Sequence, residues 1–313
     1  MKMIQAQRKS SEEILHLFNE KDIDADWSFA GFKPSDTGKW THSYHRYPAK
    51  FIPQLVEKLI DEYIFSQYVH VNDPFMGCGT TIITAISRGF KASGTDINKI
   101  AYLKKNPAKP YDALRRHLKK MQRGNDDFYQ VISQKVKERL NEYLNIKAQD
   151  AKTQPVADNS VDLIVSSSPY VTSYEYADLH QLSTIWLDFA DNLTAYKKKF
   201  IGSAYKHCNN KELKSSIGQD IVNKMQEKSK KMAKEIETFF IDMQEVFAES
   251  HRILKKGGRC CYVIGDTMLK GVDILNAEVF AESLQHSGFT IDRIIKREIP
   301  LKILPQRGCK NAA

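Results

Sequence analysis

The sequence predicts an α/β fold built on a mostly parallel sheet. Short apolar runs, typical of buried strands, alternate along the chain with stretches of helical apolar spacing. Small or acidic residues follow several of these runs, as at Gly77 and Gly79. In open parallel sheets ligands bind beyond the carboxyl ends of the strands, so the loops that follow the strands are the informative ones.

The elements are expected in an alternating order along the chain. The expected strands are residues 68–73, 91–97, 161–167, 258–266 and 290–299. The expected helices are residues 52–65, 80–89, 128–144 and 275–288, with most of 178–250. Phe128, Ile132, Val136 and Leu140 recur every four residues and favour one amphipathic helix. Gly89 and Gly288 are typical of helix ends.

Composition narrows the class of protein. The 313 residues suffice for one large α/β domain or two small ones, and the formal net charge is +9. This charge suits a polyanionic partner, although a generically basic protein has the same balance. The five cysteines form no CxxC pair, which favours a reduced intracellular chain. We find no metal-ligand pattern, signal core or membrane-length apolar run, and we expect a cytoplasmic protein without a membrane partner.

The first informative loop is Asp73-Pro-Phe-Met-Gly-Cys-Gly-Thr-Thr81. Its two glycines let the backbone turn tightly and approach a ligand, and the helix that follows presents unpaired N–H groups. No Gly-Lys-Ser/Thr ending follows, which argues against a nucleoside-triphosphate loop. An ordinary structural turn remains the alternative for this loop alone.

Two acids follow other expected strands. Asp96, in Gly94-Thr-Asp-Ile-Asn98, can accept hydrogen bonds from ribose hydroxyls, or it can cap a helix. Asp150 lies at another possible strand end, where a solvated loop acid is the alternative.

A fourth loop, Ser167-Ser168-Pro169-Tyr170, follows the buried run 161–167. The Tyr170 ring can stack on a planar base, and the serines offer acceptors for an amino group. Such acceptors stabilise positive charge that develops on an attacking amine. A proline turn with a packed tyrosine is the competing interpretation.

Together these loops resemble the amino-methylating DNA methyltransferases that use S-adenosylmethionine. The resemblance covers residues 40 to 300 and implies a Rossmann-like class I methyltransferase, with a mostly parallel seven-stranded sheet, helices on both faces and helical insertions. Residues 167–170 are similar to the catalytic Ser-Pro-Pro-Tyr tetrad, and residues 257–274 to the strand region that borders the target-base pocket. The cofactor residues that the resemblance implies are Tyr47, Pro48, Ala49, Lys50, Asp73, Pro74, Phe75, Gly77, Gly79, Thr80, Thr81, Asp96, Ile97, Asp150 and Ala151.

One position departs from the family pattern, because Ser168 stands where the tetrad has its first proline. Ser168 still has a main-chain carbonyl that can accept a hydrogen bond, but it lacks the φ angle that a proline ring fixes. Family tetrads that begin with serine mostly accompany cytosine-N4 methylation, so Ser167 favours transfer to a flipped cytosine in duplex DNA. The alternatives are adenine-N6 methylation, an RNA substrate, and a catalytically weak DNA-binding subunit of the same fold. No Pro-Cys dipeptide occurs, which disfavours carbon-5 methylation.

The resemblance also divides the chain. Residues 40–177 and 236–305 would form the catalytic core, with a helical insertion at about 103–144 that could contact DNA or form a dimer. The lysine-rich helical region 178–235 would recognise the target. Its expected DNA-binding residues are Lys197, Lys198, Lys199 and Lys206. A second copy of the chain and a cognate restriction endonuclease are further candidate partners.

Overall fold

The structure is a computed structural model. It describes residues 8–42, 51–64, 66, 69–97, 110–171, 184–185, 189–203 and 211–298. Its strands are β1 His70–Asp73, β2 Lys91–Thr95, β3 Leu144–Lys147, β4 Val161–Ser167, β5 Leu254–Val263, β6 Thr267–Leu269 and β7 Val272–Ile274. The first five form one sheet, and β6 pairs with β7 in an antiparallel hairpin.

The sheet is parallel and has the order β3-β2-β1-β4-β5. The chain moves outward from β1 through β2 to β3, then returns to the other side of β1 for β4 and β5. The order therefore reverses between β1 and β4, where doubly wound folds bind ligands. The α/β prediction is confirmed, while the described residues contain five of the seven strands expected for the sheet.

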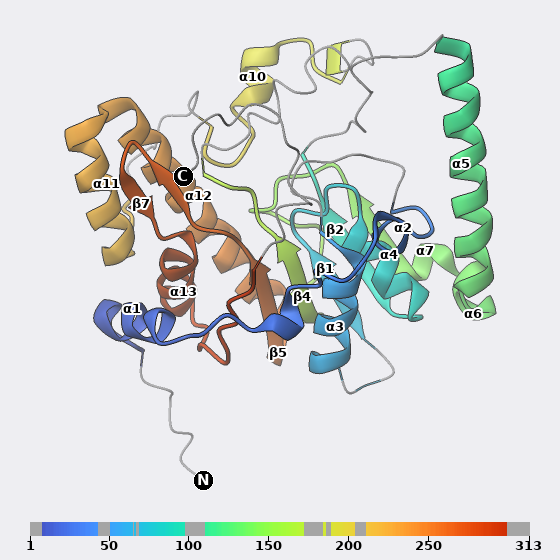
Figure 1. Ribbon diagram of the computed structural model, residues 1–313, viewed down its shortest axis with the longest axis horizontal. Coiled ribbons are helices and arrows are strands. Elements are labelled where there is room, and N and C mark those ends of the chain that lie inside the picture. The colour runs from blue at the N-terminus through green and yellow to red at the C-terminus, as the bar shows by residue number, and fades with distance from the viewer. Residues whose placement is uncertain are drawn as a thin grey trace.

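Helices precede and follow the strands. Their bounds are α1 Ser11–Asn19, η1 Ala25–Trp27, α2 Pro34–Thr37, α3 Pro53–Tyr63, α4 Thr80–Ser87, α5 Pro110–Val131, α6 Gln134–Glu138, α7 Leu140–Tyr143, α10 Leu193–Lys197, α11 Ser216–Lys228, α12 Lys230–Ile253 and α13 Asn276–His286. Figure 1 shows α11, α12 and α13 on the β5 side of the sheet and α5 at the opposite end of the molecule.

Alternating residues of β4 explain why both faces of the sheet are covered. Leu163 and Val165 belong to an apolar cluster with α3 and α4, whereas Ile164 packs on the other face against Ile253 and Leu254. Successive side chains of a strand point to opposite faces, so a strand buried on both sides reads as one apolar run. The largest apolar cluster lies among α11, α12 and α13.

The helix expected over 128–144 is wrong as a single element. Helix α5 ends at Val131, α6 begins after Ser133, and α7 leads directly into β3. The Ser133 hydroxyl accepts a hydrogen bond from the Val136 N–H at 3.4 Å and so caps a new helix. Phe128, Ile132 and Val136 still pack on the same apolar cluster, so the spacing indicated burial correctly.

The strand expected over 290–299 is also wrong for its described part. Residues 290–298 are irregular apart from one bridge between Lys296 and Ile23. Side chains rather than a backbone ladder hold the segment, because Asp292 pairs with Arg259 of β5 at 3.0 Å and Arg293 pairs with Glu62. Within the described residues, β5 therefore has a neighbouring strand only on its β4 side.

The division into catalytic and recognition regions stays a prediction. Helix α12 crosses the expected boundary at residue 235 without a break, and α11 packs against it. The expected insertion at 103–144 is helical over most of its described part. Across the described ranges, none of the helices has the length and apolar character needed to cross a membrane.

Candidate active site

Two of the predicted loops leave adjacent strands at the point where the strand order reverses. The glycine loop follows β1 and the Ser-Ser-Pro-Tyr corner follows β4, and these strands pair with Asn72 opposite Ile164. Strands in a sheet lie about 4.8 Å apart, so the two loops begin as neighbours. The structure therefore brings together the two motifs that the sequence singled out.

The glycine loop has the tight backbone that its sequence predicted. Gly77 and Gly79 have φ angles of 48° and 77°, in the left-handed region that favours glycine. Gly79 precedes α4, no side chain caps this helix, and a Cβ on Gly79 would meet nothing within 4 Å. The turn is therefore open on the side that Gly79 faces, where a ligand has room to approach the backbone.

Asp73 ties the two loops together rather than facing outward. Its Oδ1 accepts hydrogen bonds from the Ser166 hydroxyl at 2.6 Å and from the Phe75 N–H at 3.0 Å. The side chain is only 2% exposed, and this burial raises its pKa to about 6 despite the hydrogen bonds. Asp73 was predicted to bind the cofactor, and its position makes it a support of the loop.

The neighbouring loop residues are fixed by side-chain bonds to adjacent strands. The Thr95 hydroxyl donates to the Pro74 carbonyl at 2.9 Å, and the Thr81 hydroxyl donates to the Val165 carbonyl at 3.2 Å. Thr80 and Thr81 are buried. These bonds connect β1 with both β2 and β4 where the loop turns, so the main chain is held in place around Gly77.

Asp96 lies against the glycine loop, as expected for an acid after β2. Its Oδ2 accepts the Gly77 N–H at 2.9 Å, and the side chain is half-buried. The carbonyl of the next residue, Ile97, accepts a hydrogen bond from the Tyr196 hydroxyl of α10 at 3.2 Å. The predicted ribose acid thus contacts the predicted cofactor loop, and the next residue touches the predicted recognition region.

Asp150 and Ala151 follow β3, which places them on the same edge of the sheet. Asp150 Oδ1 accepts the Lys152 N–H at 3.0 Å, and the Lys152 ammonium lies 3.8 Å from Asp150 Oδ2 and 3.0 Å from Asp242. Ala151 is buried in the apolar cluster of α11–α13. Their role in cofactor binding stays a prediction.

The Ser167-Ser168-Pro169-Tyr170 corner begins on the last residue of β4. Ser168 is 2% exposed, and within the described part of the chain its buried Oγ has no hydrogen-bond partner. Pro169 and Tyr170 are half-buried. The Tyr170 ring lies beside Gly265, because a Cβ on that glycine would be 3.4 Å from Tyr170 Cε1. The tyrosine ring is therefore not enclosed in the apolar core.

Ser167 and Tyr170 line one wall of a cavity of about 1640 Å³. Gly265, Asp266 and Arg297 line it as well, and burial raises the pKa of the Asp266 carboxyl. A cavity of this size has room for a planar ligand beside the tyrosine ring. The residues after β5, which the resemblance connects with a target-base pocket, thus border the same hollow as the tetrad.

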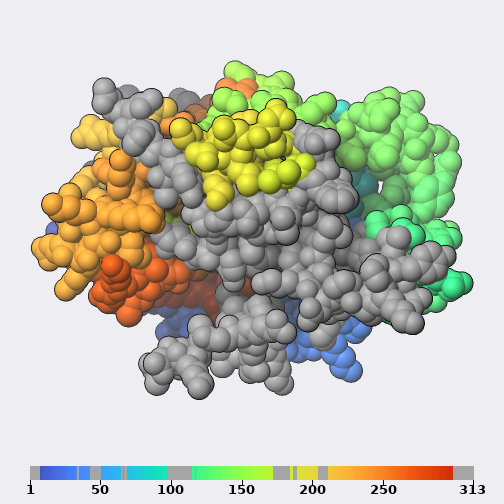
Figure 2. All heavy atoms as spheres, turned by 90° about the horizontal axis from the view of Figure 1, so that it is seen from above, coloured from blue at the N-terminus to red at the C-terminus, as the bar shows by residue number. Residues whose placement is uncertain are grey.

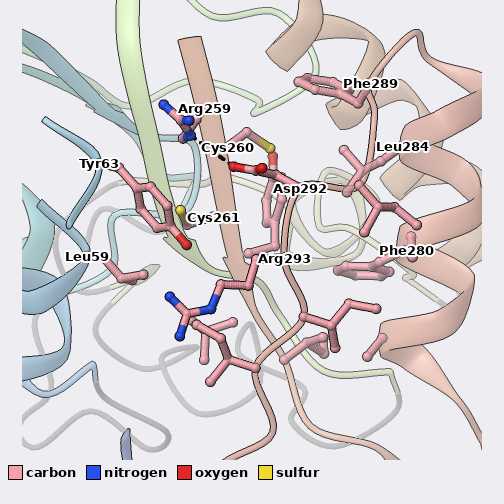
Figure 3. A pocket seen from close by; sticks show the side chains of 18 of the residues that line it. Leu59, Tyr63, Arg259, Cys260, Cys261, Phe280, Leu284, Phe289, Asp292 and Arg293 are labelled. Carbon is pink, nitrogen blue, oxygen red and sulfur yellow. Dashed lines mark hydrogen bonds and ion pairs between the residues drawn. The ribbon is translucent and has the colours of Figure 1, made fainter. Parts of the chain in front are cut away.

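The cavity continues along the edge of β5 that faces away from β4. Figure 3 shows Leu59 and Tyr63 of α3 on one side, Phe280 and Leu284 of α13 on the other, and the Arg259–Asp292 ion pair between them. Cys260 and Cys261 lie on β5, and burial raises the pKa of both thiols, that of Cys261 to about 12. Neither thiol is therefore a thiolate nucleophile at neutral pH.

The remaining predicted residues divide into described and undescribed ones. Lys198 and Lys199 are exposed at the end of α10, and Lys197 is half-buried. Tyr47, Pro48, Ala49, Lys50 and Lys206 lie outside the described residues.

Sequence reasoning missed three residues of the site. Ser166 binds Asp73, Tyr196 binds the Ile97 carbonyl, and Arg297 lines the cavity while its Nη1 donates to the Trp27 carbonyl at 3.2 Å. Ser166 directly precedes the tetrad, which was a usable signal. The other two contacts join distant parts of the chain, and no local pattern indicates them.

Comparison with known proteins identifies relatives of one kind. Residues 2–105 match the model of the DNA methylase family N6_N4_Mtase. The chain is 35% identical over 92 residues to the type II methyltransferase M.MvaI of Kocuria varians and 35% identical over 97 residues to M.MjaII of Methanocaldococcus jannaschii. It is 31% identical over 100 residues to M.BsoBI of Geobacillus stearothermophilus. These matches cover 28%, 31% and 32% of this chain and 20%, 17% and 19% of those relatives.

Similarity to solved structures is low. TrmN from Thermus thermophilus has a TM-score of 0.24 and 17% identity over 47% of this chain and 35% of that one. Geranyl diphosphate C-methyltransferase from Streptomyces coelicolor A3(2) has a TM-score of 0.22 and 12% identity over 56% and 59%. The α/β assignment rests on the strand order described above. In its matched segments the chain is therefore similar to the N6_N4_Mtase family of DNA methylases and to three type II methyltransferases.

Proposed function

We propose that this protein transfers a methyl group from S-adenosylmethionine to the N4 amino group of a cytosine flipped out of duplex DNA. One observation carries the proposal. The glycine loop and the Ser-Ser-Pro-Tyr corner leave adjacent strands, and the Asp73–Ser166 hydrogen bond of 2.6 Å joins them. A donor held by the first loop and a base held by the second would therefore meet.

The residues present fit S-adenosylmethionine, the cofactor of this family. Gly77 and Gly79 have the left-handed φ angles of a tight turn, a Cβ on Gly79 would meet nothing within 4 Å, and Asp96 is half-buried directly after β2 with acceptor capacity for ribose hydroxyls. Asp150 would meet the adenine amino group. When bound, the cofactor supplies a methyl group on a positively charged sulfur.

The corner after β4 would hold the base. Tyr170 offers a half-buried ring on the cavity wall, on which an extruded base can stack. The Ser167 hydroxyl and the Ser168 carbonyl would accept hydrogen bonds from the amino group. They stabilise the positive charge that develops on this nitrogen, and they orient its lone pair. Orientation and electrostatics supply the rate enhancement, and no covalent enzyme intermediate is required.

Ser167 supports cytosine as the target base. In the tetrads that this corner resembles, serine in the first position mostly accompanies cytosine-N4, and aspartate or asparagine mostly accompanies adenine-N6. The basic chain, with a net charge of +9 and exposed Lys198 and Lys199 directly after α10, supports duplex DNA as the substrate. The chain spans about a fifth of the length of the relatives it matches, so the comparison with them leaves the target base open.

The experiment that tests the proposal is nucleoside analysis. DNA from cells that express the protein is digested and examined by mass spectrometry, with a Tyr170→Ala strain as the control. We expect N4-methylcytosine in the first sample and none in the second. N6-methyladenine would instead assign the enzyme to adenine. Intact cofactor binding without any modified nucleoside would indicate a silent DNA-binding subunit.

A further inference from the structure

Helix α5 carries a row of cations on one face. Arg116, Lys119, Lys120 and Arg123 are all exposed, and their spacing of three, four and seven residues places them side by side. Among the described residues, no ion pair joins Arg116, Lys119 or Arg123 to a carboxylate. Like charges at this spacing repel one another, so the face becomes more stable when an anion covers it.

These cations line one wall of a cleft rather than a convex surface. The cleft has a volume of about 410 Å³, and its opposite wall is the turn Gly38-Lys39-Trp40. Lys39 adds a fifth cation, whose ammonium lies 4.6 Å from the centre of the Trp40 ring and is paired with Glu57 at 2.8 Å. Asp127 is the acidic member of the lining. Cations combined with an aromatic ring in one hollow are typical of nucleic-acid sites.

The backbone of Trp40 supports a specific role for this turn. Its φ angle of 54° lies in the left-handed region, which bulky residues rarely adopt. Such strain persists where the surrounding structure enforces it, and it concentrates at functional sites. The Trp40 ring packs on Phe128 of α5 with centroids 5.7 Å apart, so the two walls of the cleft are fastened to each other.

The contact between Trp40 and Phe128 also determines how far the basic face of α5 extends from the core. Phe128, near the end of α5, and Ile132, directly after it, pack on the apolar core, and Arg116 lies twelve residues before Phe128. At 1.5 Å per residue the basic face extends about 18 Å from this anchor. Figure 1 shows the first turns of α5 at the height of α10, and Figure 2 shows the two helices apart along the long axis.

We propose that the cleft between α5 and the Gly38–Trp40 turn binds the sugar–phosphate backbone of duplex DNA, at a distance from the nucleotide that enters the catalytic cavity. The inference rests on the proposed function, because it takes the same DNA as its ligand. Arginine and lysine contacts to phosphate position a duplex without reading its sequence. The cleft thus acts as a second attachment point, separate from the lysines of α10.

The test measures DNA binding across ionic strength. The variant Arg116→Ala/Lys119→Ala/Arg123→Ala keeps a good helix former at each position. The matched control, Lys9→Ala/Lys21→Ala/Lys91→Ala, removes three exposed lysines elsewhere. A labelled mixed-sequence duplex is titrated by fluorescence anisotropy between about 50 and 200 mM salt, a range over which phosphate contacts change affinity strongly.

We expect the slope of log affinity against log salt to fall by about 1 per lost contact, hence about 3 for the triple variant. Affinity near 0.1 M salt should fall between about tenfold and a few hundredfold. The control variant should behave like the unchanged protein, and cofactor affinity should be the same in all three. An unchanged slope in the α5 variant would overturn the inference and leave α5 as a solvated helix face.

The outcomes separate this inference from the proposed function. If the unchanged protein methylates DNA but the α5 variant has an unchanged salt slope, the cleft does not bind DNA and the proposed function stands. If the α5 variant has a reduced salt slope but no modified nucleoside is found, the cleft binds DNA and the proposed methyl transfer is wrong. Absence of DNA binding by the unchanged protein would defeat both. If the α5 variant instead loses self-association in analytical ultracentrifugation while its salt slope is unchanged, the face is a dimer contact and the inference is wrong.

Discussion

The two halves of the candidate active site are built differently. Around the glycine loop, hydrogen bonds that involve Asp73, Thr81, Thr95 and Asp96 connect the loop to its two neighbouring strands, β2 and β4. Around Tyr170, the side chains line a cavity of about 1640 Å³ that follows the edge of β5 facing away from β4. The glycine loop is fixed by internal hydrogen bonds, whereas the region around Tyr170 is an open cavity.

This difference matches what each half would have to bind. A cofactor of constant shape is best served by a preformed backbone, which avoids an ordering cost on binding. A base that is delivered by a large polymer needs room to enter, and stacking replaces the contacts that it had in the duplex. Substitutions near the glycine loop should therefore alter stability and cofactor affinity, whereas substitutions at Tyr170 should alter turnover.

The largest effect is expected at Tyr170. Tyr170→Ala removes the stacking surface and the positioning of the base, which should lower methyl transfer by on the order of 100- to 1000-fold. Cofactor affinity should be nearly unchanged. A tritium-methyl assay on DNA measures the first quantity and calorimetry the second. Tyr170→Phe, which keeps the ring, is the control. If the alanine variant keeps its turnover, Tyr170 does not position the base, and the two halves do not differ in the way described above.

The buried Asp73 carboxyl predicts a pH-dependent stability. Its pKa is about 6 in the folded chain against 3.8 for the free group, so the folded state holds a proton that the unfolded state has lost. The free energy of unfolding should therefore fall by about 3 kcal/mol as pH rises from about 4 to about 7.

Asp73→Asn keeps both acceptor bonds but does not titrate, so it should lack this part of the slope. Urea denaturation at both ends of the range gives the difference between the two proteins. Parallel pH profiles would show that Asp73 is ionised throughout.

At Asp96 we expect an effect on the cofactor. Asp96→Ala removes the acceptor for the Gly77 N–H and for the ribose hydroxyls, and it should weaken cofactor binding about 10- to 100-fold. Asp96→Asn, which keeps an acceptor, should lose less. Calorimetric titration measures both affinities. Equal affinity in the alanine variant and the unchanged protein would rule out the ribose contact.

The smallest effects compare two buried serines. Ser166→Ala removes the donor to the buried Asp73 carboxylate and should destabilise the fold by about 1–3 kcal/mol. Ser168→Ala removes a buried hydroxyl that has no partner among the described residues, so its effect should stay within about 0.5 kcal/mol. Urea denaturation at neutral pH checks both. Similar losses for the two serines would mean that the Ser168 hydroxyl is bonded in solution.

Local patterns predicted the parts of the site that lie next to strand ends. The glycine loop, Asp96 and the tetrad each follow an apolar run, and all three lie at one edge of the sheet. The short strand β3 was hidden behind a four-residue apolar spacing that runs through three separate helices, α5, α6 and α7. The Asp73–Ser166 bond spans 93 residues, and only the pairing of β1 with β4 reveals it.

The irregular segment 290–298 was missed for a different reason. Its isoleucines suit a strand, and sequence alone does not show that Asp292 and Arg293 form ion pairs with Arg259 and Glu62. These ion pairs hold the segment in place of the strand hydrogen bonds that the sequence predicted. In this region tertiary contacts outweigh local β-propensity.

The hydrogen bond from Tyr196 to the Ile97 carbonyl has a thermodynamic consequence. It connects α10, which Lys198 and Lys199 follow directly, to the backbone next to Asp96, so the proposed sites for the two substrates share a contact. Coupling between two binding equilibria is reciprocal. If bound S-adenosylmethionine raises the affinity for DNA by some factor, bound DNA must raise the affinity for S-adenosylmethionine by the same factor. A Tyr196→Phe substitution, which removes the hydrogen bond, should reduce both effects equally.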